Sequence, residues 1–156
     1  IDQRTKVQED WCLHVEANLD TMENDDERAE EKYRRSLAIQ PKNLSARSHL
    51  AGIYNFRSEY QRAAKELEAI LSVFPDHFPT LRSMARVQEK LKNYSLAADY
   101  MYRAWQVPGQ RMSTGLQYLR LLQRSGQKSK LDQVLLENPA LREKWNSYNN
   151  DRSRSR

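Results

Sequence analysis

The sequence predicts an all-α fold built from antiparallel helix pairs, and its composition and periodicity support this. Good helix formers, above all Ala, Leu, Glu, Arg, Lys and Gln, dominate the 156 residues, and only four Gly and five Pro are present. Val and Ile, which favour strands, are scarce. Hydrophobic residues make up 38% of the chain, which is enough for one domain with a substantial buried core.

An internal period of 34 residues organises the chain. Pro41 and Pro75 are one period apart, as are Tyr60 and Tyr94. Two alanine series share the spacing, namely Ala17, Ala51 and Ala85, and Ala29, Ala63 and Ala97. Turn-forming positions also recur, at Asn24, Ser58, Lys92 and Gly126. Because helices approach within about 8–10 Å only beside small side chains, we expect the alanines to lie at helix crossings.

Each period is predicted to contain two helices. In the second period, apolar residues recur with helical spacing from Leu44 to Tyr54. The polar segment 57–59 ends this helix, and a second helix runs from Tyr60 to a stop before Pro75. The predicted repeats span residues 10–43, 44–77, 78–111 and, in degenerate form, 112–138.

Four further segments are interpreted from local patterns. The acidic run 25–27 is expected to cap the second helix of the first repeat. Residues 1–9 are expected to be a leader or the end of a preceding helix. Asn138 and Pro139 are expected to start a capping helix over 139–148, in which Leu141 and Trp145 cover the last repeat. The tail 149–156 has no apolar residue and is predicted to be disordered.

The pattern resembles the tetratricopeptide repeat (TPR) family over roughly residues 10–138. The second repeat matches at Leu50, Ala51, Tyr54, Tyr60, Ala63, Leu67 and Pro75, and the third at Leu81, Met84, Ala85, Tyr94, Ala97, Met101 and Ala104. The first departs at Glu16 and Asp20, and the fourth has Leu131 in place of Ala. The resemblance implies a right-handed α-solenoid of about three TPR repeats, a degenerate fourth and a capping helix. It also implies a scaffold or adaptor that binds protein.

No motif for catalysis, a cofactor or a metal is present. The histidines His14, His49 and His77 have no metal-ligand spacing with one another or with Cys12, and no glycine-rich phosphate loop occurs. The chain is therefore predicted not to be an enzyme. The single cysteine excludes an internal disulfide and favours a reducing, cytoplasmic compartment. No apolar run approaches the roughly 20 residues needed for membrane insertion.

Charge is unevenly distributed along the chain, whose net charge is +5. Residues 1–43 carry seven Lys/Arg and eleven Asp/Glu, residues 44–111 carry ten and six, and residues 112–156 carry nine and four. The pI near 9.4 and the Ser-Arg tail keep nucleic acid as an alternative ligand. No aromatic residues interleave with the basic cluster, as single-strand binding usually requires.

In TPR proteins, first helices line a concave groove that contacts peptides. Carried over by repeat position, the predicted partner-binding residues are Trp11, His14, Asn18, Ser48, His49, Asn55, Arg82, Arg86, Lys90, Arg120 and Arg124. The spacing of Arg82, Arg86 and Lys90, repeated at Arg120 and Arg124, predicts a positive stripe and hence an acidic partner. An ordinary solvated face remains the alternative interpretation.

The resemblance does not extend to the carboxylate-clamp subfamily, which grips chaperone tails. The five matching positions hold His14, Asn18, His49, Pro79 and Ser83, and only the asparagine is retained. The leading hypothesis is therefore a scaffold for an extended, acidic segment in a larger complex. A nucleic-acid-associated repeat protein is one alternative. The other is a spacer in a longer array, in which Glu16 and Asp20 face a further upstream helix.

Overall fold

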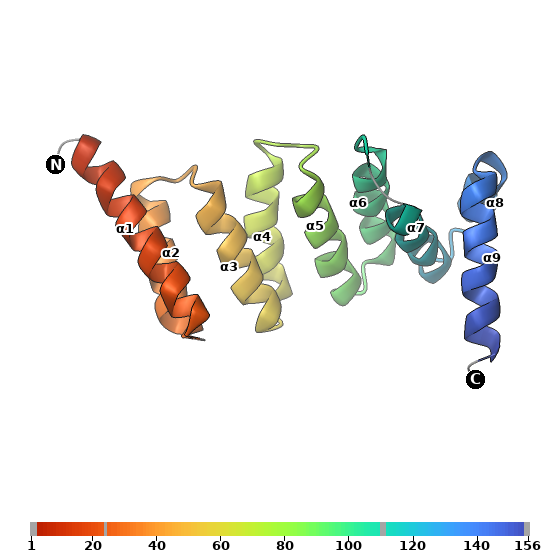
Figure 1. Cartoon of the computed structure of the whole chain (residues 1–156), viewed down its shortest axis with the longest axis horizontal. Coiled ribbons are helices and arrows are strands. Elements are labelled where there is room, and N and C mark those ends of the chain that lie inside the picture. The colour runs from red at the N-terminus through yellow and green to blue at the C-terminus, as the bar shows by residue number, and fades with distance from the viewer. Residues whose placement is uncertain (1–2, 24, 110–111, 155–156) are drawn as a thin grey trace. The chain divides into compact units, whose positions relative to one another are not determined.

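A computed structural model describes residues 3–23, 25–109 and 112–154, and this part of the chain forms nine helices and no strands (Figure 1). The all-α prediction is therefore confirmed. The chain divides into two compact units, Ile1–Pro75 and Asp76–Arg156. Among the described helices, none is both long and apolar enough to cross a membrane.

The first unit contains two helix pairs joined by short turns. The helices are α1 (Gln3–Met22), α2 (Asp26–Ile39), α3 (Leu44–Phe56) and α4 (Tyr60–Leu71). Each helix packs against the next one in the chain. At the start of α2, the Asp25 side chain accepts a hydrogen bond from the Arg28 backbone N–H at 3.2 Å, so the predicted acidic cap is present.

The second unit contains two further pairs and an additional helix. The helices are α5 (Phe78–Lys90), α6 (Tyr94–Gln106), α7 (Met112–Arg124), α8 (Lys128–Glu137) and α9 (Pro139–Arg154). The turn inside three of the chain's helix pairs uses a left-handed residue, at Ser58 (φ 61°), Lys92 (φ 64°) and Gly126 (φ 73°). Only glycine adopts this conformation without steric cost. Because Ser58 and Lys92 adopt it as well, the turn between the helices, and not the residue type, determines the backbone conformation at this position. The fourth predicted turn residue, Asn24, lies outside the described residues.

Small side chains fill the helix crossings, as their period predicts. Ala29, Ala63 and Ala97 are fully buried, and the exposed fractions of Ala17, Ala51 and Ala85 do not exceed 5%. In the second unit a single apolar cluster joins α5 to α9 through residues that include Ala97, Met101, Tyr118 and Trp145. Burial raises the pKa of the Tyr118 phenol to about 12, as expected for a hydroxyl inside this cluster.

The first repeat differs from its prediction in two respects. Helix α1 starts at Gln3, so residues 3–9 are the first turns of this helix and not a separate leader; residues 1–2 are not described. Glu16 and Asp20 do not need an upstream helix, because both pair with Lys32 of α2, whose Nζ lies 3.4 Å and 2.7 Å from their carboxylates. These ion pairs replace the apolar contacts that the repeat pattern would supply.

A buried polar network joins the start of α1 to the next repeat. The Ser36 hydroxyl donates to the Asp10 carboxylate, and the Asn43 amide donates to both, at 3.2 Å to Asp10 Oδ1 and 3.0 Å to Ser36 Oγ. Asn43 Oδ1 also accepts from the Ala46 backbone N–H and caps α3. These hydrogen bonds link α1, α2 and the start of α3.

The last helix is longer than predicted. Helix α9 continues to Arg154, so the prediction of a disordered tail is wrong for residues 149–154; residues 155–156 lie outside the described part. A polar segment can extend an established helix, because propagation is far easier than nucleation. Helix α9 begins at Pro139, and the Asn138 carbonyl accepts its first backbone hydrogen bond, from Arg142 N–H at 3.0 Å, as expected for the start of this helix. The Asn138 side-chain amide donates to the Val134 carbonyl at 2.9 Å, at the end of α8.

A glycine lets α9 approach α7 closely. A Cβ added to Gly115 would lie 3.1 Å from Leu141 Cδ1 and 3.1 Å from Trp105 Cε2. Leu141 and Trp145 are almost fully buried in the same place, at 1% and 4% exposure. The amphipathic start of α9 therefore packs on α7 and α8.

Candidate functional site

Each predicted partner-binding residue lies on the first helix of a pair. In the first unit these are Trp11, His14 and Asn18 on α1, and Ser48, His49 and Asn55 on α3. In the second unit they are Arg82, Arg86 and Lys90 on α5, and Arg120 and Arg124 on α7. Trp11, Ser48 and Asn55 are exposed, whereas His14 and Asn18 are half-buried.

An aromatic cluster brings three of these residues together in the first unit. The Tyr33 ring, which is fully buried, stacks on His49 with centroids 5.0 Å apart and planes within 4°. His14 meets both rings edge-on, at 5.6 Å from Tyr33 and 5.5 Å from His49. The Tyr33 hydroxyl donates to Asn18 Oδ1 at 2.6 Å, and His14 Nε2 lies 3.2 Å from Ser45 Oγ.

Tyr33 is the residue that sequence reasoning missed at this cluster. Tyr33 lies on the second helix of the first pair, outside the set predicted from first helices, yet it contacts His14, Asn18 and His49. Burial raises the pKa of Tyr33. Although His49 is exposed, the stacking on Tyr33 removes part of the solvent around its ring, and this partial desolvation and the charge of His14 lower the pKa of His49, which favours the neutral imidazole. This surface is therefore aromatic and polar rather than charged.

In the second unit, a carboxylate offsets part of the predicted positive stripe. Glu89 of α5 pairs with Arg120 at 3.3 Å and also with Arg124. Arg124 Nη2 further donates to the Tyr94 hydroxyl at 3.0 Å, and its guanidinium lies 4.4 Å from the Tyr94 ring centroid. The stripe is consequently not an uninterrupted row of free cations.

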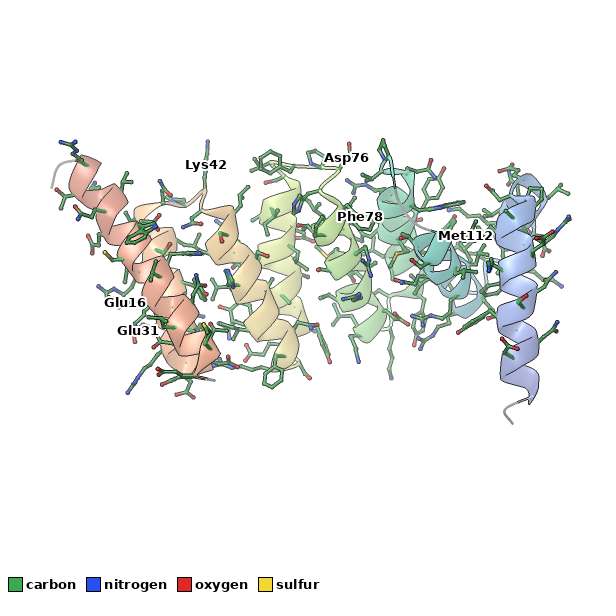
Figure 2. The ribbon with its side chains drawn as sticks, viewed as in Figure 1. Glu16, Glu31, Lys42, Asp76, Phe78 and Met112 are labelled. Carbon is green, nitrogen blue, oxygen red and sulfur yellow. The ribbon has the colours of Figure 1, made fainter. Side chains whose placement is uncertain are left out.

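The basic residues of α5 are differently placed. The half-buried Arg82 guanidinium lies 5.4 Å from the ring centroid of Phe78. Phe78, the first residue of α5, is labelled in Figure 2. Arg86 and Lys90 are exposed one and two turns further along. Within the part of the chain that the structure describes, none of these three side chains pairs with a carboxylate. Their charges are therefore available to an external group.

No family model and no curated protein matches the sequence. Solved structures, however, share its architecture. The C-terminal TPR-containing domain of an FK506-binding protein from Plasmodium falciparum aligns with a TM-score of 0.69 and 16% identity, over 83% of this chain and 97% of that chain. The first TPR of Spaghetti (RPAP3), bound to the HSP90 peptide SRMEEVD, aligns with a TM-score of 0.68 and 12% identity, over 76% and 94%. YrrB, described as a TPR protein with an unusual peptide-binding site, gives 0.67 and 21%, over 81% and 68%.

The chain has a TPR fold. The second helices of the four pairs, α2, α4, α6 and α8, begin at residues 26, 60, 94 and 128, one 34-residue period apart. At these identities the likeness shows the fold alone. Among the described residues of this TPR chain, no group of three His, Cys, Asp or Glu side chains is arranged to hold a metal ion.

A second charged cluster of the TPR fold involves helices α2, α3 and α4. Glu30, only 8% exposed, pairs with Arg57 and Arg62 at 2.5 Å each and with Arg34 at 2.8 Å. Burial alone would raise the pKa of Glu30, but the hydrogen bond from Arg62 and the charges of Arg34 and Arg62 lower it. The Arg62 guanidinium also lies 3.9 Å from the Tyr54 ring centroid. These arginines are paired internally, so the cluster links the two helix pairs of the first unit and is not a free anion site.

We expect the His49 cluster to make stability fall as pH is lowered from about 7.5 to 5. Because the pKa of His49 is lowered in the folded state, the unfolded chain binds the proton first, beginning near the ordinary value of about 6.5. His49→Phe keeps a ring on Tyr33 and removes the titration, so the melting temperature should become less dependent on pH in this range.

The matched control is His77→Phe in the second unit, which should leave the pH dependence due to His49 unchanged. The contribution of Glu30 falls in another window, because its lowered pKa makes stability fall only below about pH 4.5. Thermal melts by circular dichroism at several pH values measure the contribution of His49 above about pH 5 and that of Glu30 below about pH 4.5. An unchanged slope in His49→Phe would contradict the expectation.

Proposed function

We propose that this chain is a non-enzymatic scaffold or adaptor that binds an extended, acidic segment of a partner protein and supports assembly of a larger complex. The TPR fold supports this, since two of the similar structures are described as peptide-bound or peptide-binding. The observation that carries the proposal is the free basic face of α5.

Three cations in the proposed contact lie along two turns of one helix. Successive members of Arg82, Arg86 and Lys90 are four residues apart and hence about 6 Å apart along the axis. An extended strand places alternate side chains about 7 Å apart. Acidic residues at alternate positions of a bound segment would therefore match the spacing of the cations. Arg120 and Arg124 are weaker candidates, because Glu89 already offsets their charge.

The first unit would supply a different kind of contact. Its predicted partner-binding residues, Trp11, His14, Asn18, Ser48, His49 and Asn55, carry no carboxylate and no permanent positive charge. They suit the backbone and neutral side chains of a segment, through hydrogen bonds and aromatic packing. The first unit thus suits a neutral segment, and α5 of the second unit suits an acidic one.

The charge reversal Arg82→Glu/Arg86→Glu should weaken binding of an acidic peptide at least about 30-fold, since loss of close charge pairs typically costs 2–5 kcal/mol. The probe is a synthetic peptide with Glu at alternate positions, titrated by fluorescence anisotropy at several salt concentrations. Affinity should also fall with rising salt as the Debye length shortens. Helical content should not change, because Arg86 is exposed and Arg82 lies at the surface of α5.

The matched control is Lys128→Glu/Lys144→Glu, which changes the net charge equally through exposed residues of α8 and α9. It should bind the peptide nearly as tightly as the original chain. A single-stranded oligonucleotide is titrated in parallel, because a nucleic-acid ligand would show similar salt dependence. Binding of the oligonucleotide alone, or equal peptide affinity in both double variants, would refute the proposal.

A further inference from the structure

Helix α1 has a second apolar face that the fold leaves uncovered. Its large apolar side chains Val7, Trp11, Val15, Leu19 and Met22 are 53%, 65%, 36%, 54% and 79% exposed. They recur every three or four residues, so they form one stripe along the helix. The buried side chains Leu13 and Ala17 project from the opposite side, toward α2. We call the exposed set the α1 stripe.

One member of the α1 stripe occupies a position that is an interface elsewhere in the fold. Leu19 corresponds to Ile53 of α3 and Leu121 of α7, one and three periods later. Ile53 and Leu121 are 5% and 1% exposed, and a preceding helix packs against each of their helices. The same position in α1 is apolar but lacks such a neighbour within the described chain. The stripe therefore has the composition of a contact surface and not of a solvated face.

We propose that the α1 stripe binds the α1 stripe of a second copy of this chain, with the two helices antiparallel. Val15 lies at the middle of the stripe, so a two-fold axis there places Trp11 of one copy against Leu19 of the other. Val7 then faces the region of Met22. Such a pairing is self-complementary and closed, which limits assembly to a dimer.

The charges at the ends of the stripe favour a second copy in this orientation. Arg4 is exposed one turn before the first residue of the stripe and on the same face of the helix, and Glu23 is exposed directly after its last residue. Asp26, at the start of α2, adds a second carboxylate at that end. Antiparallel pairing sets Arg4 of each copy against the acidic end of the other. A parallel pair would instead bring like charges together.

The stripe is long enough for a dimer of moderate affinity. From Val7 to Met22 it extends about 22 Å, at 1.5 Å per residue. Stable interfaces bury roughly 800 Å² on each partner, whereas five exposed side chains on one helix supply less. We therefore expect association in the micromolar range, so the measured mass should approach twice the monomer mass of 18.5 kDa as concentration rises.

The first test is sedimentation velocity across this concentration range. The full chain should shift from monomer to dimer, and Trp11→Glu/Val15→Glu should stay monomeric throughout. The control Phe56→Glu changes another apolar side chain of the same unit, 82% exposed but outside the stripe, and should dimerise normally. A chain that remains monomeric at the highest concentration overturns the proposal and assigns the stripe to a different partner.

Orientation is tested by crosslinking in a Cys12→Ser background. Val15→Cys should form a disulfide-linked dimer under mild oxidation, because residues on the two-fold axis approach within the 4.4–6.8 Å Cα separation that a disulfide needs. Val7→Cys should not, since its counterpart lies at the far end of the helix. Crosslinking at both positions would indicate a parallel pair and would refute the antiparallel arrangement.

Charge reversal separates self-association from binding of another protein. Arg4→Glu should weaken the dimer at least tenfold, because the change acts at both ends of a symmetric pair, and so should Glu23→Lys. An equimolar mixture of the two variants should recover a heterodimer, because each then supplies the charge that the other lost. Failure of the mixture to recover would count against the proposal. Self-association does not rest on the proposed peptide contact at α5, which the single change Val15→Glu, outside the predicted partner-binding residues, should leave intact.

Discussion

Replacing Ala97 with arginine should lower the free energy of unfolding by about 3–5 kcal/mol, and Ala63→Arg should have a similar effect. Both alanines are fully buried near the start of the second helix of a pair. A long charged side chain there must either separate the helices or be buried without a partner. Overpacking costs about 1–3 kcal/mol, and burial of an unpaired polar group adds a comparable amount.

Each substitution has a neighbour on the same helix that serves as its control. Leu96→Arg replaces a side chain that is 43% exposed on α6, and Gln61→Arg replaces an exposed residue on α4. Both should change the stability by less than about 0.5 kcal/mol, as is usual for surface positions. Urea unfolding followed by circular dichroism compares the four variants. Stability in Ala97→Arg and Ala63→Arg equal to that of their controls would refute the assigned helix crossings.

Removal of the Trp145 side chain should cost about 3–5 kcal/mol, the range for a buried Trp→Ala change. Trp145 is 4% exposed, belongs to the apolar cluster of the second unit and lies 5.9 Å from the Tyr148 ring. Among the side chains of α9 that the structure describes, Leu141 would then be the one fully buried anchor left. We therefore expect α9 to detach and expose the apolar side chains of α7 and α8.

Trp11→Ala is the matched control, because it removes the same side chain from a position that is 65% exposed. In dilute protein, where dimerisation is negligible, it should leave the melting temperature almost unchanged. Amide hydrogen exchange should show faster exchange in α7, α8 and α9 of the Trp145→Ala variant and little change in α1 to α4. Uniformly unchanged protection would contradict the role assigned to Trp145.

Sequence periodicity by itself determined the helix pairs. The helix pairs follow from the apolar spacing, the alanine series and the closing prolines. These signals lie within a few residues of one another or recur once per repeat, so they can be recognised from the sequence alone. The observed pairs lie within the spans that the period predicts, apart from the early start of α1 at Gln3. The capping role of Asp25 could also be predicted from the sequence, because its hydrogen bond joins residues only three positions apart.

Tertiary structure alone decided which polar side chains are free. Glu89 meets Arg120 and Arg124 across 31 and 35 residues, and Lys32 reaches Asp20 from the opposite helix of a pair. A count of charges along one helix cannot include such partners, because they come from other helices. The sequence analysis therefore did not include the carboxylate of Glu89, which offsets part of the positive stripe, or the ammonium group of Lys32, which pairs with Glu16 and Asp20.

Contacts from another helix also decide which face of α1 is buried and which is exposed. Its sequence contains apolar residues on both sides, and composition does not distinguish Leu13, which is buried, from Val7, which is exposed. Only the packing of α2 selects one side as core and leaves the other as a surface. Local patterns thus determined where the helices of this protein begin and pair. Contacts between helices decided which charges and which apolar side chains remain available to a partner, because burial is a property of the assembled fold.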